Sequence, residues 1–203
     1  GCFKNCHLLS NFFIKRSGNV EIHENEFINC DELESIHIES NIKNEIGESC
    51  QINFYPKCFN QLKALKNILI QGGDVRISKS SFIDCFSLQS VSIKQASNVC
   101  IEQSQFLNYK SFKIISIESN SSISLKQNCF NGCISLETID IYGKLIFIGD
   151  DCFSNCTNIK KVVISKVHEL SVGVKAFLNC SQLEKVEFKA KKKIIIKNNC
   201  FGD

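Results

Sequence analysis

The sequence predicts a repeat solenoid, a chain wound into stacked coils that consist mainly of β-strands. Phenylalanine recurs along the whole chain at intervals of 23 or 24 residues, with one longer interval of 32. Each interval contains two short stretches in which apolar and polar residues alternate, which is the pattern of a half-buried strand. Self-similarity with a period of roughly 20–50 residues is the signature of a solenoid.

The recurring phenylalanines mark where each predicted coil begins, and we call them anchors. Three residues after an anchor stands Cys, Leu or Tyr, and three further on stands Leu, Phe or Ile. This spacing is typical of a 3₁₀ turn or a single α-helical turn. The anchors are Phe3, Phe27, Phe59, Phe82, Phe106, Phe130, Phe153 and Phe177, with a partial coil at Phe201.

Each predicted coil carries one strand after this turn and a second strand before the next anchor. The first strand has two apolar residues two positions apart, such as Ile36 and Ile38. The second has them seven and five residues before the next anchor, such as Ile146 and Ile148. Two strands and one turn cannot bury their own inward side chains, so we expect the coils to stack at about 4.8 Å and form parallel sheets.

This pattern resembles the BspA-type, or Treponema pallidum-type, leucine-rich repeats. The coil that carries the resemblance best is residues 146–159, Ile-Phe-Ile-Gly-Asp-Asp-Cys-Phe-Ser-Asn-Cys-Thr-Asn-Ile. The Asn-, Lys- and Ile-rich composition is similar to protist versions of the family. The resemblance implies a leucine-rich-repeat-like solenoid with two short strands and one turn of 3₁₀ or α-helix per coil of 23–24 residues. Two features depart from bacterial members, because Pro56 is the only proline and the Ile-Gly step is rare.

We expect residues 1–203 to form a single solenoid domain. The chain contains no methionine and both of its ends fall inside a repeat, so we interpret it as a fragment of a longer protein. The second coil is longer than the others, and the excess lies around Ser40–Gln51. An insertion in a solenoid goes to a loop on one face. It represents either tolerated variation at an exposed turn or part of a binding face.

The thirteen cysteines are predicted to be buried free thiols. Six of them occupy the position three residues after an anchor, and five occupy the position just before one. Stacking would place neighbours within a column nearly 5 Å apart, whereas the Cβ atoms of a disulfide are about 3.5–4.5 Å apart. If these thiols act as small apolar groups, Cys156→Ser should destabilise the fold more than Cys156→Ala.

The sequence predicts no enzyme, no catalytic residue, no metal site and no cofactor. The four histidines show no ligand spacing, and the Cys pairs four residues apart arise because the two cysteine columns are four apart. The net charge of +3 argues against nucleic-acid binding driven by bulk electrostatics. Because no run of 18 apolar residues occurs, we expect no membrane insertion by this segment.

A partner is expected on the outward side chains of the first strand of each coil, where a solenoid presents a ribbed sheet. Large side chains at the N-terminal end of this face either mark a contact or are scattered surface hydrophobes. The candidate partner-binding residues are Phe13, His37, Leu69, Ser92, Ser116, Asp140, Tyr142, Val163 and Glu187.

The resemblance implies a non-enzymatic, adhesin-like binding module of a larger cell-surface or secreted protein, with a protein or glycan as its ligand. The alternative is an intracellular scaffold that uses the same surface, in the cytoplasm. Of three N-glycosylation sequons, Asn120 is the best acceptor because it lies in a turn, whereas Asn155 and Asn179 fall where the repeat itself favours Asn-Cys. Residues 190–193, together with Lys185, Lys189 and Lys197, form a basic corner, which is either a solvated turn or a patch for an acidic or heparin-like ligand.

Overall fold

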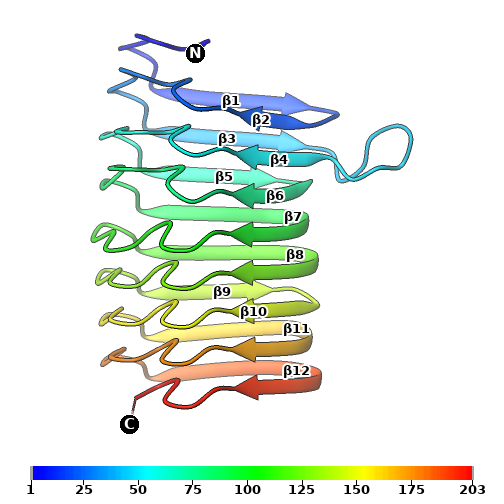
Figure 1. The fold of residues 1–203 in the computed structure, drawn as a ribbon, viewed down its shortest axis with the longest axis vertical. Coiled ribbons are helices and arrows are strands. Elements are labelled where there is room, and N and C mark those ends of the chain that lie inside the picture. Colours follow the sequence, from blue (N-terminus) through cyan, green and yellow to red (C-terminus); the bar gives the residue numbers. More distant parts are fainter. Residues whose placement is uncertain (1, 203) are drawn as a thin grey trace.

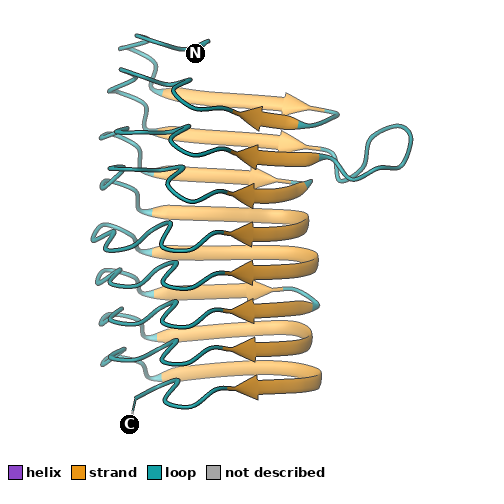
Figure 2. Ribbon diagram, in the orientation of Figure 1, coloured by secondary structure: helices purple, strands orange, loops and turns teal. Residues whose placement is uncertain are grey.

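The computed structural model describes residues 2–202 and confirms a parallel β-solenoid (Figure 1). Strands and loops make up all of the described chain, and no helix occurs in it (Figure 2). The strands are β1 (Asn11–Arg16), β2 (Val20–Ile22), β3 (Ser35–Ser40), β4 (Gln51–Phe54), β5 (Asn67–Gln71), β6 (Asp74–Ile77), β7 (Ser90–Ile101), β8 (Ile114–Leu125), β9 (Thr138–Tyr142), β10 (Leu145–Ile148), β11 (Lys161–Val172) and β12 (Lys185–Ile196).

Two parallel ladders run the length of the solenoid. The first ladder contains the first strand of every coil, from β1 through β3, β5, β7, β8, β9 and β11 to β12. The second ladder runs from β2 through β4, β6, β7, β8, β10 and β11 to β12. The long strands β7, β8, β11 and β12 belong to both ladders because they bend around one edge of the solenoid (Figure 1). We call this edge the corner.

The long strands bend at the corner through local irregularities in their backbone. The β7–β8 register shifts on both sides of Ala96, and the β11–β12 register shifts on both sides of Val167. Both of these side chains are fully buried, while the preceding Gln95 and Lys166 take positive φ values of 53° and 58°. A bulge of this kind increases the local bend of a strand.

The expected turn of 3₁₀ or α-helix after each anchor is replaced by a series of separate turns. In the second coil, Cys30 N donates to Phe27 O at 3.2 Å and Leu33 N donates to Cys30 O at 3.1 Å. The three-residue hydrogen-bond spacing is therefore present, but Asn29 has a φ of 61° and interrupts any helix. A positive φ at the third residue defines a type II turn, for which Asn is one of the preferred residues. This geometry explains why Asn so often precedes the column cysteine.

The core is a row of stacked phenylalanine rings. Consecutive anchor rings have centroids 5.0–5.8 Å apart from Phe3 to Phe201, and most of the pairs are stacked face to face. The anchors between Phe27 and Phe177 are fully buried. Burial of one such ring stabilises the fold by roughly 1.5–3 kcal/mol, and each aromatic pair adds about 0.5–1.5 kcal/mol.

The insertion in the second coil forms a small hairpin that projects from the corner between β3 and β4 (Figure 1). The Asn44 side chain holds its tip, since Oδ1 accepts hydrogen bonds from Ile46 N at 3.2 Å and Glu48 N at 2.8 Å. Ile46, at the tip, is 79% exposed. The predicted loop is confirmed, and it lies on the corner.

Candidate functional site

Eight of the nine candidate binding residues lie in one column across the first ladder. Strand pairing aligns each with its counterpart in the next coil, because the register of every pair matches the repeat. Tyr142 lies in the neighbouring column, where it pairs with Glu118 and Ser165. The aligned residues are Phe13, His37, Leu69, Ser92, Ser116, Asp140, Val163 and Glu187.

The N-terminal end of this column carries the large side chains. Phe13 is 57% exposed, and its ring lies 4.7 Å from that of His37, centroid to centroid. The half-buried Leu69 follows in the next coil. Beside them, one carboxylate oxygen of Glu39 forms an ion pair with Lys15 Nζ at 3.1 Å. The other oxygen of Glu39 lies 3.2 Å from His37 Nε2, but these two atoms do not have hydrogen-bond geometry. This end therefore combines an exposed aromatic ring with ionisable groups.

The rest of the column is less suited to a large contact. Ser92 and Ser116 are half-buried and small. Val163 is only 8% exposed, so it contributes little surface even though its position in the column is as expected. Asp140 carries the only charge between the serines and Glu187.

Glu187, in the last complete first-ladder strand, is held by two lysines. Lys185 donates to one carboxylate oxygen, and Lys189 donates to the other at 2.7 Å. These hydrogen bonds lower the pKa of Glu187 to about 2, and the bond from Lys185 has the larger effect. The hydrogen bond to Glu187 also raises the pKa of Lys189. The lysines nearest this column are thus neutralised locally.

Most members of the cysteine columns lie in the interior, while Cys2 is exposed and Cys6 and Cys180 are half-buried. All thirteen thiols are free, and nine of them are buried. Burial raises the pKa of Cys85 and of Cys180 to about 12, so both remain protonated at neutral pH. A thiol is a nucleophile only when deprotonated, and these two are therefore unreactive.

These thiols also have a polar role that the sequence did not reveal. The column three residues after the anchors donates hydrogen bonds to the anchor carbonyl of the preceding coil, from Cys85 Sγ to Phe59 O at 2.9 Å and from Cys133 Sγ to Phe106 O at 3.2 Å. Tyr109 occupies the same column, and its hydroxyl donates to Phe82 O. The expectation that thiols serve only as small apolar groups is therefore wrong for this column.

A second feature missed from the sequence is a shallow depression at the corner. Its volume is about 350 Å³, and Lys144, Lys166 and Lys191 contribute its positive charge. The basic corner predicted from the sequence comprised only lysines from Lys185 onward. An alignment of the corner positions of the last three coils would have brought Lys144 and Lys166 into the same group.

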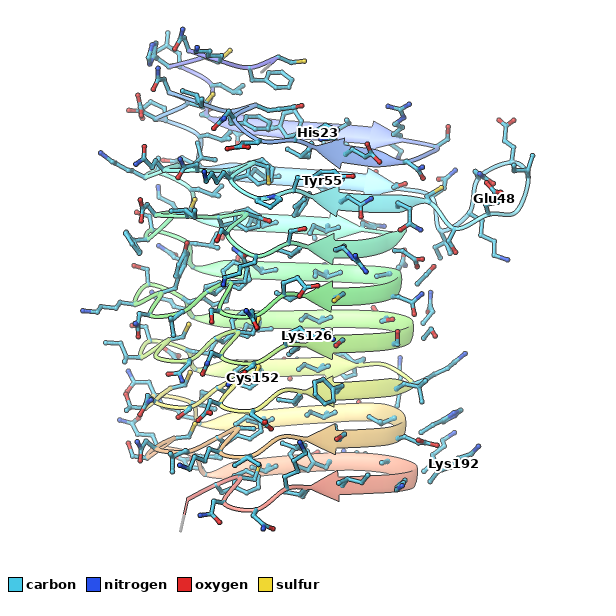
Figure 3. The ribbon with its side chains drawn as sticks, in the orientation of Figure 1. His23, Glu48, Tyr55, Lys126, Cys152 and Lys192 are labelled. Carbon is cyan, nitrogen blue, oxygen red and sulfur yellow. The ribbon has the colours of Figure 1, made fainter. Side chains whose placement is uncertain are left out.

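The second ladder also carries an exposed apolar patch. It consists of Leu145 and Phe147 on β10 with Ile195 on β12, and it is bordered by serines. The Lys126 ammonium lies 5.9 Å from the centroid of the Phe147 ring (Figure 3 labels Lys126). Phe147 and Ile195 both point outward, since their side chains are exposed.

Neither metal ligands nor a membrane-spanning helix are found in the described part of the chain. Within residues 2–202, His, Cys, Asp and Glu side chains form no group of three that could hold an ion. The same residues contain no helix of the length and hydropathy needed to cross a bilayer.

The turns that follow each anchor form one edge of the solenoid, which we call the turn edge and which is rich in Asn and Cys. Coils with one Phe anchor, two strand ladders and such an edge define a leucine-rich-repeat class of β-solenoid. The chain belongs to the BspA-type leucine-rich repeat family, whose model matches in six copies over residues 1–70, 48–157 and 99–203.

Comparison with curated proteins finds no match. Two solved structures are similar to the chain. A leucine-rich cell surface protein from Faecalibacterium prausnitzii A2-165 has 22% identity and a TM-score of 0.44 over 94% of this chain and 62% of its own. A leucine-rich repeat protein from Bacteroides ovatus has 17% identity and a TM-score of 0.34 over 95% of this chain and 76% of its own. The chain thus spans about three-fifths of the first of these proteins.

Proposed function

We propose that this chain is a non-enzymatic binding module of a larger cell-surface or secreted protein. It uses the outward face of its first ladder to hold a partner, which is a protein or, as a second class, a glycan. The intracellular scaffold is the alternative, and it would use the same face.

The observation that carries this proposal is the exposed Phe13 ring packed against His37 at one end of a continuous column. A rigid sheet keeps these side chains at fixed spacing, so little conformational entropy is lost on binding. Aromatic residues, Phe among them, are enriched in the buried centre of protein interfaces. Family membership supports the proposal, since repeat solenoids present extended binding surfaces.

A panel of immobilised extracellular proteins and glycans, probed with the purified chain, tests which surface binds. We expect Phe13→Ser to abolish binding to the panel member that the native chain captures. The matched control is Phe86→Ser, because Phe86 is also 57% exposed but lies on the turn edge. Full retention of binding by Phe13→Ser, or equal loss in both variants, would contradict the proposal.

The location is tested by the state of Asn120 in protein isolated from its native source. Asn120 is exposed at the corner of β8. We expect mass spectrometry to find an N-glycan on Asn120, since its sequon lies on an accessible bend. Native material that carries an unmodified Asn120 and comes from a reducing compartment would favour the scaffold instead.

A further inference from the structure

Positive charge is concentrated at the C-terminal end of the corner. Residues 141–203 contain eleven lysines against six carboxylates, although the whole chain has a net charge of only +3. Lys144 lies in the turn between β9 and β10, Lys166 in the bend of β11 and Lys191 in β12. All three line the shallow corner depression. Lys192, next to Lys191, also points outward at the corner (Figure 3).

These lysines are not neutralised by neighbouring carboxylates. Within residues 2–202, Lys144, Lys166 and Lys191 make no ion pair, in contrast to Lys189, which is paired with Glu187. A single carboxylate, Glu118, lies among the lining residues. An unpaired cluster of cations attracts an anionic ligand and accelerates its association.

The remaining lining groups can recognise a sugar ring. Tyr142 is partly exposed, and the Lys166 ammonium lies 5.9 Å from its ring centroid. The ring of His168 offers a hydrogen-bonding nitrogen within the same depression. An aromatic face beside an imidazole and ammonium donors provides both apolar contact and hydrogen bonds for a pyranose.

We propose that this depression binds an anionic glycan, namely an oligosaccharide with sulfate or uronic-acid groups. The ammonium groups of Lys144, Lys166 and Lys191 meet its anions, and Tyr142 supports a sugar ring. Because stacked coils repeat at about 4.8 Å, lysines from successive coils can follow the charges along an extended chain. This site goes beyond the function proposed for the first ladder, with which it shares only Tyr142.

Calorimetric titration with a size-defined heparin octasaccharide tests the proposal. We expect salt-sensitive binding that the triple variant Lys144→Gln/Lys166→Gln/Lys191→Gln weakens by about tenfold or more, because three charge-assisted contacts are lost. The matched control is Lys63→Gln/Lys79→Gln/Lys110→Gln, which removes the same charge from exposed positions outside the depression. This control should change the affinity by less than about twofold. Phe13→Ser should bind the octasaccharide as the native chain does.

Three results would overturn the proposal. The first is no binding of the octasaccharide at low salt. The second is an equal loss of affinity in both triple variants, which would assign binding to overall charge. The third is equally tight binding of a polyglutamate peptide or an oligothymidylate, since a built sugar site must distinguish a glycan from these other polyanions. Circular dichroism of each variant shows whether it keeps the native fold.

Discussion

Cys156 Sγ donates a hydrogen bond to the carbonyl oxygen of Phe130, the anchor of the preceding coil, at 3.1 Å. The same oxygen accepts a hydrogen bond from Cys133 N within its own coil at 3.3 Å. The column thiol therefore joins two coils at a carbonyl that also closes a turn. Each such contact connects the turn edge of one coil to the next.

The thiol column predicts a specific order of mutant stabilities. Cys156→Ser should cost no more than Cys156→Ala, because a hydroxyl at this site has Phe130 O as its acceptor. This reverses the order expected if the column were purely apolar. Chemical denaturation under reducing conditions measures both variants. A serine variant less stable than the alanine variant by more than about 1 kcal/mol would contradict the role of Phe130 O as an acceptor.

Tyr109 provides an independent test of the same column. Tyr109→Phe should lower the free energy of unfolding by about 1 kcal/mol, since it removes the donor to Phe82 O while keeping the buried ring. The control is Tyr142→Phe, at a partly exposed ring outside the core. An unchanged stability in Tyr109→Phe would show that the hydroxyl makes no useful hydrogen bond.

Truncation of a phenylalanine in the anchor row should cause a large loss of folding stability. Phe130→Ala should cost about 3–5 kcal/mol because it leaves a cavity between two stacked rings, those of Phe106 and Phe153. Phe86→Ala is the control, since this ring is exposed on the turn edge. Urea denaturation followed by circular dichroism gives both values. Similar midpoints for the two variants would contradict the buried anchor row.

Alkaline pH should destabilise the solenoid through its buried thiols. Burial raises the pKa of Cys85 and Cys180 from near 9 to about 12, and that of Cys200 to about 11. Between about pH 9 and 12 the unfolded chain releases these protons while the folded chain retains them, so stability falls as pH rises through this window. Below pH 9 this effect is absent.

Denaturation midpoints across this pH range, measured with a reducing agent present, check the effect. Cys85→Ala/Cys180→Ala should show a shallower decline than the native chain, because two of the titrating groups are gone. Parallel declines in the two proteins would show that folding does not raise the pKa of these thiols.

Gly72 lies at a point of the corner where two coils approach too closely for a side chain. It has a φ of +82°, and a Cβ placed there would lie 1.8 Å from the carbonyl oxygen of Ser40 in the preceding coil. Gly72→Ala should therefore lower stability by at least about 2 kcal/mol. Gly18→Ala is the control, because its Cβ would meet nothing closer than 3.9 Å. Thermal melts that rank the two variants equally would contradict the close approach of the coils.

The fold was predictable from the sequence because apolar residues recur at the same positions of every coil, and several such columns independently indicate which side chains are buried. Ile52 and Ile77 alternate with polar neighbours, and both are fully buried as expected. Tertiary geometry accounts for what the sequence left out. Three-residue spacing alone does not distinguish a helical turn from successive turns, and only the positive φ of residues such as Asn29 decides between them.

The alignment of the candidate binding residues in one column was predictable from the sequence, but the exposure of each residue was not. Period-two alternation placed Phe13 and Glu187 on the same face, and strand register aligns them. Alternation gives no information on how much neighbouring side chains cover a residue, so the burial of Val163 was not foreseen. The corner depression was missed because Lys144 and Lys166 are separated by a whole coil and meet only when the coils stack.

The spacing of the coils along the first ladder tests the central claim most directly. Pulsed electron paramagnetic resonance can measure it with genetically encoded spin-label side chains, which avoid the native thiols. Labels at Phe13 and Asp140 lie five strands apart in the ladder, and labels at Phe13 and Glu187 lie seven apart. At about 4.8 Å per strand, the two distances should differ by about 10 Å. A difference near 20 Å, as expected for repeats packed through helices roughly 8–10 Å apart, would contradict the stacked parallel coils.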